Sequence, residues 1–291
     1  MADRHLHIIT DCGPGMGTGH LQRMMLLAWY LDQYGPCTVS LQVLRPCKDM
    51  PGEILPLVSD SIHPGTDIIV RDMRDSTADE IRTLQQHAPV IVIDDEGAGA
   101  ELASERVYIL PRPGLTAGEN TFPPFFLYGY GFYTDMKAGT APPHRDIDLS
   151  LYTGNSEDHP YTEKTLSLLP GDLNIALLYG DKQDIYTSLL TRSRCVMSHF
   201  GILLYEAHLC GCHLLSVNPT EYHSHLADIA PLPVHNFGSI DTIQSDPIEK
   251  LLHQLLSSQE KPPPTPAGIV QKVHENLVSF SRWLISLPFY R

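Results

Sequence analysis

The sequence predicts two successive α/β domains, each with a parallel sheet, and three observations lead to this expectation. Short apolar runs alternate with helical patterns through the first part of the chain. The alternation stops in a segment rich in proline, glycine and aromatic residues, at 111–146, and then begins again. Strand–helix–strand alternation is typical of parallel sheets with helices on both faces. With 291 residues, the chain is long enough for two domains of ordinary size, each with its own core.

The first domain is expected at residues 1–140, and its elements follow from apolar periodicity. The expected helices lie at 21–31 and 75–87, and the expected strands at 6–9, 38–44, 67–70, 90–93 and 107–110. Residues 125–133 are too aromatic for a linker, so we expect them to pack at the domain junction. Residues 137–144 have the composition of an exposed interdomain linker.

The second domain is expected at residues 145–268, where the alternation begins again. The expected elements are helices at 161–169, 184–192 and 201–210, and strands at 147–151, 175–178, 195–197 and 214–217. A proline-rich stretch at 261–266 predicts a solvated hinge, and an amphipathic helix is expected after it at 269–285.

A glycine-rich segment at 13–19 joins the first expected strand to the first expected helix, and His20 follows in the first helical turn. Glycines let the backbone approach a ligand closely, and a helix N-terminus offers unpaired N–H groups and partial positive charge. Because that charge disfavours the imidazolium, we expect a neutral His20 that can act as a general base. The alternative is a tight turn with a half-buried histidine that packs and caps the helix.

Acidic residues also follow the expected strands of the first domain, at Asp72, Asp94 and Asp95. Ligands in parallel α/β sheets bind beyond the carboxyl ends of the strands, where His20 is expected too. For Asp94 and Asp95 we favour a strand-end turn that caps the next helix. Paired carboxylates could instead hold a metal, but no partner is identifiable.

Composition restricts the classes of partner. The net charge is −14 and the 20 Lys and Arg residues are scattered, which argues against binding to nucleic acid, although a local cationic site for one small phosphate ligand stays open. No apolar run reaches membrane-spanning length, and the N-terminus has no signal-peptide pattern. We therefore expect a cytoplasmic protein whose six cysteines are free thiols. No cofactor is expected, and His223-Ser224-His225 lacks the acidic neighbours of a metal site.

Three segments together carry a resemblance to a known family. Residues 17–23 match a Gly-x-Gly-His-x-x-Arg loop, and residues 92–96 match a Val-Ile-Asp-Asp stretch. Residues 198–206, followed by Leu209-Cys210-Gly211, match the signature Ser-x-Gly-Gly-Ser-Thr-x-Tyr-Glu…Leu-Gly. In this order the chain resembles the UDP-sugar hydrolases of pseudaminic acid biosynthesis. That family removes UDP from a 2,4-diacetamido-2,4,6-trideoxyhexose and is related to the GT-B glycosyltransferases.

The resemblance implies a GT-B-like α/β fold, with two Rossmann-like domains facing across a cleft and residues 269–291 returning to the N-terminal domain. It implies a small-molecule nucleotide sugar as the ligand and no requirement for a metal. His20 would activate water, and Glu206 would accept hydrogen bonds from the ribose hydroxyls. The loops that would approach the ligand contain Gly17, Thr18, Gly19, Gly154, Asn155 and Gly201. For Glu206 the alternative is an exposed helical carboxylate.

The chain also departs from the family's pattern. The family's Gly-Gly-Ser-Thr is Phe200-Gly201-Ile202-Leu203 here, so two hydroxyls that would bond phosphate oxygens are absent. Two or three lost bonds at about 1.5–3 kcal/mol each would weaken UDP binding severely. The family's Asp-Ser-Tyr is Asp72-Met73-Arg74, and its Asn-Gln pair is Tyr222-His223. Arg74 could compensate by placing a cation in the cleft.

Two hypotheses follow from the motifs and the departures together. The first is a hydrolase, or a transferase, that acts on a nucleotide-activated sugar in surface-glycan biosynthesis. The second is a non-catalytic GT-B-like binding or scaffold protein that has lost UDP binding. A third option is a sugar with a different leaving group.

Overall fold

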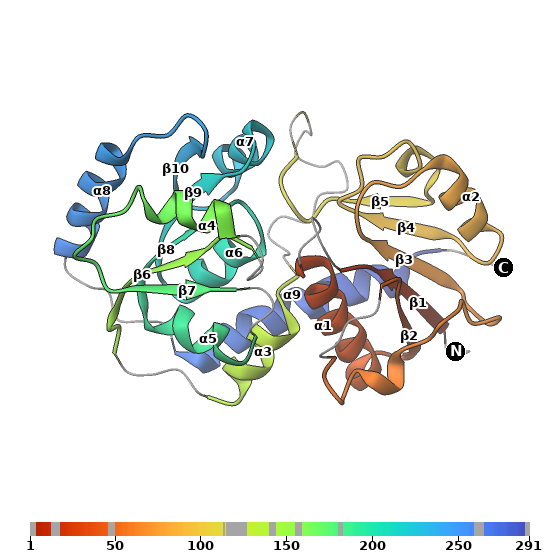
Figure 1. Ribbon diagram of the computed structural model, residues 1–291. Coiled ribbons are helices and arrows are strands. Elements are labelled where there is room, and N and C mark those ends of the chain that lie inside the picture. The colour runs from red at the N-terminus through yellow and green to blue at the C-terminus, as the bar shows by residue number, and fades with distance from the viewer. Residues whose placement is uncertain are drawn as a thin grey trace. The chain divides into compact units, whose positions relative to one another are not determined.

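The computed structural model describes residues 4–12, 18–45, 50–112, 114, 127–139, 144–154, 159–179, 183–258 and 265–288. The chain divides into two compact units. The first unit comprises Met1–Leu110, Leu115–Tyr130 and Val273–Arg291, and the second comprises Pro111–Gly114 and Gly131–Lys272. Each unit contains a five-stranded sheet, and all strand pairs in both sheets are parallel (Figure 1).

The sheet of the first unit has the strand order β2-β1-β3-β4-β5. Its strands are β1 (Arg4–Thr10), β2 (Cys37–Val43), β3 (Ile68–Asp72), β4 (Val90–Ile93) and β5 (Glu105–Val107). This is a doubly wound order whose direction reverses between β1 and β3, and ligands bind at such switch points beyond the carboxyl ends of the strands. Thr10 and Asp72 are register partners there.

Helices α1 (Gly19–Tyr34) and α2 (Ala78–Gln85) and the short 3₁₀ helices η1 (Leu55–Leu57) and η2 (Ala100–Leu102) belong to this unit. Ile81 of α2 packs on apolar residues of β1, β3 and β4. The C-terminal part of α9 (Pro266–Ser286) also belongs to it, and buries Val273, Leu277, Phe280 and Leu284 at helical spacing. Arg4 of β1 donates to the carbonyl groups of Ile285 and Leu287 at 2.6 and 3.0 Å, which satisfies the end of this helix.

The sheet of the second unit has the order β10-β9-β8-β6-β7, which is the same doubly wound order read from the opposite edge. Its strands are β6 (Ile147–Tyr152), β7 (Ile175–Leu178), β8 (Ser193–Ser198), β9 (His213–Asn218) and β10 (Val234–Ser239). The direction reverses between β6 and β8, where Tyr152 and Ser198 are register partners. The two sheets therefore place their switch points at equivalent strands.

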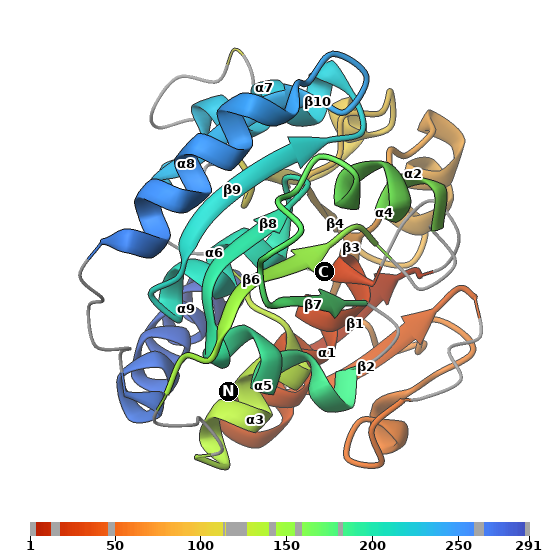
Figure 2. The same cartoon turned by 60° about the vertical axis from the view of Figure 1, so that its left-hand side comes forward.

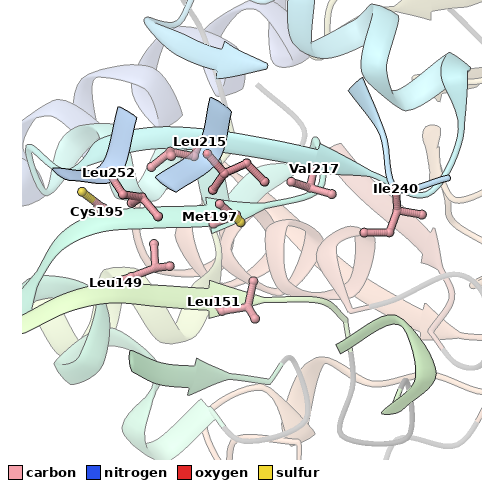
Figure 3. Packing of buried hydrophobic residues seen from close by; sticks show 9 residues of the cluster. Leu149, Leu151, Cys195, Met197, Leu215, Val217, Ile240 and Leu252 are labelled. Carbon is pink, nitrogen blue, oxygen red and sulfur yellow. The ribbon is translucent and has the colours of Figure 1, made fainter. Parts of the chain in front are cut away.

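The helices of the second unit are α3 (Tyr130–Lys137), α4 (His159–Leu166), α5 (Gln183–Arg192), α6 (Ile202–Leu209), α7 (Glu221–Ile229) and α8 (Ser245–Ser257). Alternate residues of β6, β8 and β9 form the core on one face, where Leu149, Cys195 and Leu215 lie together with Leu252 of α8 (Figure 3). Figure 2 shows α8 running along this sheet beside β9.

The structure corrects the expected elements at four places. The strand expected at 107–110 lies earlier, as β5 at Glu105–Val107, and the N–H groups of Ile109 and Leu110 donate to the Asp94 carboxylate instead of to a neighbouring strand. The aromatic segment leads into α3, which the sequence reasoning did not predict, and β10, α7 and α8 were missed as well. The final helix begins at Pro266, earlier than expected, and residues 261–264 of the expected hinge lie outside the described residues.

Candidate functional site

The carboxyl edge of the first sheet brings His20, Arg23 and Asp72 together at the switch point. His20 lies in the first turn of α1, and its Nδ1 is 2.8 Å from Oδ1 of Asp72, the last residue of β3. Arg23 follows one helical turn later and donates from Nε and Nη2 to the two oxygens of the same carboxylate, each at 2.5 Å. Asp72 is fully buried, whereas 23% of the His20 side chain is exposed. The chain therefore fixes one carboxylate inside the unit and presents the imidazole at its surface.

The protonation of this group follows from its charges. Burial by itself raises the pKa of Asp72, but the Arg23 guanidinium and the His20 ring together bring that pKa below its ordinary value. An ionised carboxylate can only accept hydrogen bonds, so in the 2.8 Å contact Nδ1 of His20 carries the proton and is the donor to Asp72. Nη2 of Arg23 approaches the same nitrogen at 3.3 Å, a longer contact that the shorter bond to Asp72 outweighs. In the neutral ring the lone pair is then on Nε2. This is the arrangement of a general base oriented by a carboxylate.

Asp94 is the fourth member of the group and has an unusual backbone. Its φ is 50°, in the left-handed region that residues other than glycine seldom adopt. Its Oδ1 accepts from the N–H groups of Ile109 and Leu110 at 2.7 and 3.1 Å, and its Oδ2 accepts from Nη1 of Arg23 at 2.8 Å. Burial raises the pKa of Asp94, Arg23 opposes this effect, and the nearby Asp72 adds to it. One guanidinium thus joins two carboxylates whose pKa values move in opposite directions.

The expectation that Asp94 and Asp95 cap the next helix is wrong. Helix α2 is capped by Thr77 and Glu80, and η2 has no side-chain cap. Asp95 instead accepts from the N–H groups of Ser76 and Gly97 and from Nη1 of Arg71, each at 2.9 Å. Asp95 therefore connects the loops that follow β3 and β4.

At the switch point of the second sheet, the backbone is held by glycine and asparagine. Gly154 follows β6 with a φ of 121°, a conformation that favours glycine. Gly201 precedes α6, which has no side-chain cap, and a Cβ on Gly201 would meet no atom within 4 Å. The N–H group of Phe200 donates at 2.8 Å to Asn218, a fully buried residue at the end of β9. The sequence reasoning missed Asn218, although a polar residue directly after an apolar strand was the signal that identified Asp94.

Glu206 lies on α6 and is only 2% exposed. Its Oε2 accepts a hydrogen bond from the Tyr186 hydroxyl at 2.6 Å. Burial raises the pKa of Tyr186 well above its ordinary value, and the neighbouring Glu206 raises it further. The alternative of an exposed helical carboxylate is therefore wrong, while the contact of Glu206 with ribose stays a prediction.

The loop before α6 and the first turn of that helix contain three apolar side chains, those of Phe200, Ile202 and Leu203. Phe200 and Leu203 are buried, and the Phe200 ring packs edge-on against Tyr205 with centroids 6.4 Å apart. Ile202 is half-buried. The side chains of Phe200 and Leu203 therefore pack inside the second unit at the start of α6.

The other predicted site residues are distributed between the two units. Thr18 precedes α1 without a side-chain capping bond, Gly19 is the first residue of α1, and Arg74 is exposed after β3. Gly17 and Asn155 lie outside the described residues. The structure brings His20, Asp72 and Asp94 together in the first unit, and it places Gly154, Gly201 and Glu206 in the second.

The part of the chain that the structure describes has three further features. There, no three His, Cys, Asp or Glu side chains are arranged to hold a metal ion. No helix in the described ranges combines the length and apolar character needed to cross a bilayer. Cys195, Cys210 and Cys212 are free cysteines, and Cys47 lies outside the described residues.

Comparison with known proteins identifies the fold. No family model and no curated protein matches the sequence. Among solved structures, the S. aureus MnaA–UDP co-structure is similar with a TM-score of 0.54, 10% identity and 98% of each chain covered. The glycotransferase of kitacinnamycin gives a TM-score of 0.53 at 12% identity, over 97% of this chain and 96% of the other. The glycosyltransferase SnogD from Streptomyces nogalater gives 0.51 at 12% identity, over 98% and 99%.

Identities this low establish the fold alone. With two five-stranded parallel sheets of doubly wound order, the similarity assigns the chain to the GT-B-like α/β class. The expected fold class, two Rossmann-like units of GT-B type, is confirmed.

Proposed function

We propose that this protein is an enzyme acting on a nucleotide-activated sugar, as a hydrolase of the UDP-sugar type in which His20 activates water. The observation that carries the proposal is the hydrogen bond between His20 and Asp72, with Asp72 held by two bonds from Arg23. Because the buried carboxylate accepts a hydrogen bond from the protonated Nδ1 of His20, Nε2 is the nitrogen left to act as the base. General-base catalysis of this kind typically contributes about two to four orders of magnitude in rate.

The ligand class is supported by two independent likenesses. One structural neighbour is a UDP co-structure, and two others are glycosyltransferases by name. The sequence motifs resemble the UDP-sugar hydrolases of pseudaminic acid biosynthesis. The proposal takes Thr18, Gly19 and Arg74 of the first unit and the loops of Gly154 and Gly201 of the second as ligand-binding elements. Glu206 would accept a ribose hydroxyl.

The proposed reaction is hydrolysis of the bond between the sugar and the diphosphate. Nε2 of His20 takes a proton from water as the water oxygen forms its new bond. Attack at the anomeric carbon breaks the bond from that carbon to oxygen, and attack at the adjoining phosphorus breaks the phosphorus–oxygen bond. Both routes yield UDP and the free sugar. In ¹⁸O-labelled water the label enters the sugar in the first route and UDP in the second.

The test is the release of UDP from a panel of UDP-sugars by the wild-type chain and by His20→Gln. We expect the variant to lower kcat at least 100-fold with little change in KM, because glutamine cannot take the proton. His87→Gln is the matched control, since His87 is an exposed histidine of the same unit. Equal turnover by His20→Gln would reject the catalytic role.

A second candidate function is a binding or scaffold protein of GT-B type that no longer binds UDP. The burial of Phe200 and Leu203, where the family has a glycine and a hydroxyl residue, favours it. Thermal unfolding with a panel of nucleotides and nucleotide sugars separates the two functions. A rise in Tm with UDP together with turnover supports the hydrolase, and unchanged Tm with every nucleotide supports the scaffold.

A further inference from the structure

Three segments that are distant in sequence bring aromatic and imidazole rings together at the switch point of the second sheet. Tyr152 is the last residue of β6, His199 directly follows β8, and His223 lies in the first turn of α7. The ring centroids of Tyr152 and His199 are 5.4 Å apart, and those of His199 and His223 are 6.4 Å apart. Tyr222 extends the row, with its ring centroid 5.7 Å from that of His223.

The backbone at both histidines is fixed from within the unit. His199 is followed by Phe200, whose N–H group is held by Asn218 at 2.8 Å, and then by Gly201 at the start of α6. The Nδ1 atom of His223 is 2.7 Å from the hydroxyl oxygen of Thr220, which also caps α7 by accepting the N–H of His223. The rings of His199 and His223 are half-buried, so each has a defined position as well as a face toward solvent.

The chemistry of these rings matches what the neighbouring loop has lost. Phe200, Ile202 and Leu203 offer no side-chain hydrogen-bond donor, whereas an imidazole donates from a ring nitrogen and carries positive charge when protonated. Charge-assisted hydrogen bonds to phosphate oxygens are stronger than neutral ones. Backbone N–H groups at the start of α6, which has no side-chain cap, lie two residues from His199.

We propose that His199 and His223 bind the phosphoryl oxygens of a diphosphate-containing ligand, in place of the hydroxyl groups missing from the loop before α6. The identity of that ligand as a nucleotide sugar rests on the function proposed above. Tyr152 packs against His199 and positions it.

The experiment measures binding of UDP and of inorganic pyrophosphate to the full chain by calorimetry. We expect His199→Gln and His223→Gln each to weaken both probes at least tenfold, since each variant removes one charge-assisted bond. His225→Gln is the matched control, because His225 is an exposed histidine of the same helix, and its affinity should equal that of the wild type. In ¹⁵N spectra of the wild type, the ring nitrogens of His199 and His223 should shift on addition of pyrophosphate while those of His225 do not.

Unchanged affinity in both histidine variants, or no binding of either probe by the wild type, would overturn this inference. Melting temperatures of the variants show whether weaker binding reflects a folding defect, and the ring-nitrogen shifts of the wild type do not depend on any variant. Turnover of UDP-sugars is scored separately. Histidine-dependent pyrophosphate binding without turnover supports this inference and argues against the hydrolase, whereas turnover with unchanged affinities overturns this inference alone.

Discussion

The two units have the same strand order, yet their switch points differ in chemistry. In the first unit, the carboxyl edge of the sheet at the switch point contains four charged or ionisable side chains. They are joined by hydrogen bonds of 2.5–2.8 Å and belong to His20, Arg23, Asp72 and Asp94. In the second, the edge contains rings, an uncapped helix and uncharged groups such as Asn218. One topology therefore supports a buried ionic network in one unit and an aromatic, mostly neutral edge in the other.

The difference shows which features of such a site the topology determines. The strand order determines where side chains meet, because the last residues of β1 and β3, and of β6 and β8, are register partners in both sheets. It does not determine what those side chains are. Asp72 ends β3, and the equivalent position at the end of β8 is Ser198. The charge at that single position decides whether the unit can hold an arginine and orient a histidine.

The largest expected effect is that of Asp72→Asn on the stability of the first unit. Asparagine cannot balance the buried Arg23 guanidinium, and breaking a buried ion pair costs about 3–5 kcal/mol. Ser198→Ala, at the equivalent position of the second unit, removes one hydrogen bond to the His199 carbonyl and should cost about 1 kcal/mol. Urea unfolding measures both variants. Similar losses would contradict the proposed contrast between the two switch points.

The loop before α6 gives the next effect. Phe200→Ala deletes a buried ring that packs on Tyr205 and should cost about 3 kcal/mol. Ile202→Ser, two residues later, introduces a hydroxyl at a half-buried position and should cost about 1 kcal/mol. Urea unfolding and UDP titration of both variants check this. A small loss of stability in Phe200→Ala would show that packing of this ring does not stabilise the unit. Tighter UDP binding by Ile202→Ser would indicate descent from a UDP-binding protein.

Periodicity and strand-end polarity predicted much of this architecture. The apolar run at 90–93 is strand β4, which is buried throughout and therefore needs continuous apolar residues. The runs at 6–9 and 175–178 are strands as well, although His7 interrupts the first and β7 is only partly buried. The segment 218–258 was missed. Its strand β10 contains Asn236 and Gly238 and is only partly buried, so it has no such run. A polar side chain on a strand is accommodated by tertiary hydrogen bonds that the local sequence does not reveal. Here Asn236 donates to Ser224 and Asp228.

The sequence allowed us to predict which residues belong to the candidate site, but not which of them are hydrogen-bonded to one another. His20 and Asp72 were recognisable as residues at strand and helix ends, yet their 52-residue separation hides the hydrogen bond between them. Arg23 was recognisable as the last residue of the Gly-x-Gly-His-x-x-Arg loop, whereas its burial against two carboxylates depends on β3 and β4 being neighbours. Tyr186 and Glu206 are paired for a similar reason, since α5 and α6 pack in the same unit and no local pattern records it.

The pair of Tyr186 and Glu206 gives a smaller effect. Tyr186→Phe removes the hydroxyl that donates to the buried Glu206 carboxylate. Leaving a buried carboxylate oxygen without its hydrogen-bond donor should lower the free energy of unfolding by about 1–2 kcal/mol. Tyr34→Phe is the control, because the Tyr34 side chain is 57% exposed in the first unit, and it should change stability by less than about 0.5 kcal/mol. Urea unfolding of both variants measures the difference. Equal effects would mean that Glu206 is not stabilised through Tyr186.

The smallest effect is the response of the first unit to acid, and it depends on histidines away from the switch point. Burial lowers the pKa of His5, the nearby His63 and His7 lower it further, and Asp67 opposes them. Burial also lowers the pKa of His7, where Gln42 opposes the shift and His63 and His87 add to it. The His5 and His63 rings are stacked with centroids 4.6 Å apart, and both His5 and His7 bond the Ser40 hydroxyl of β2.

A histidine whose pKa is lowered by folding binds fewer protons in the folded state than in the unfolded state. Its stabilisation is therefore fully present above about pH 6.5, the ordinary histidine value, and is lost as the pH falls below it. The lowered pKa of Asp72 acts in a separate window, below the ordinary carboxylate range of about 4. We expect hydrogen exchange, corrected for its intrinsic pH dependence, to show β1 and β2 losing protection between pH 7.5 and 5.5 to a greater extent than β6 and β8. His5→Gln should reduce the difference, because it removes one titrating ring and leaves His7 without its neighbouring charge. Equal loss of protection in the two sheets would show that acid sensitivity does not distinguish the units.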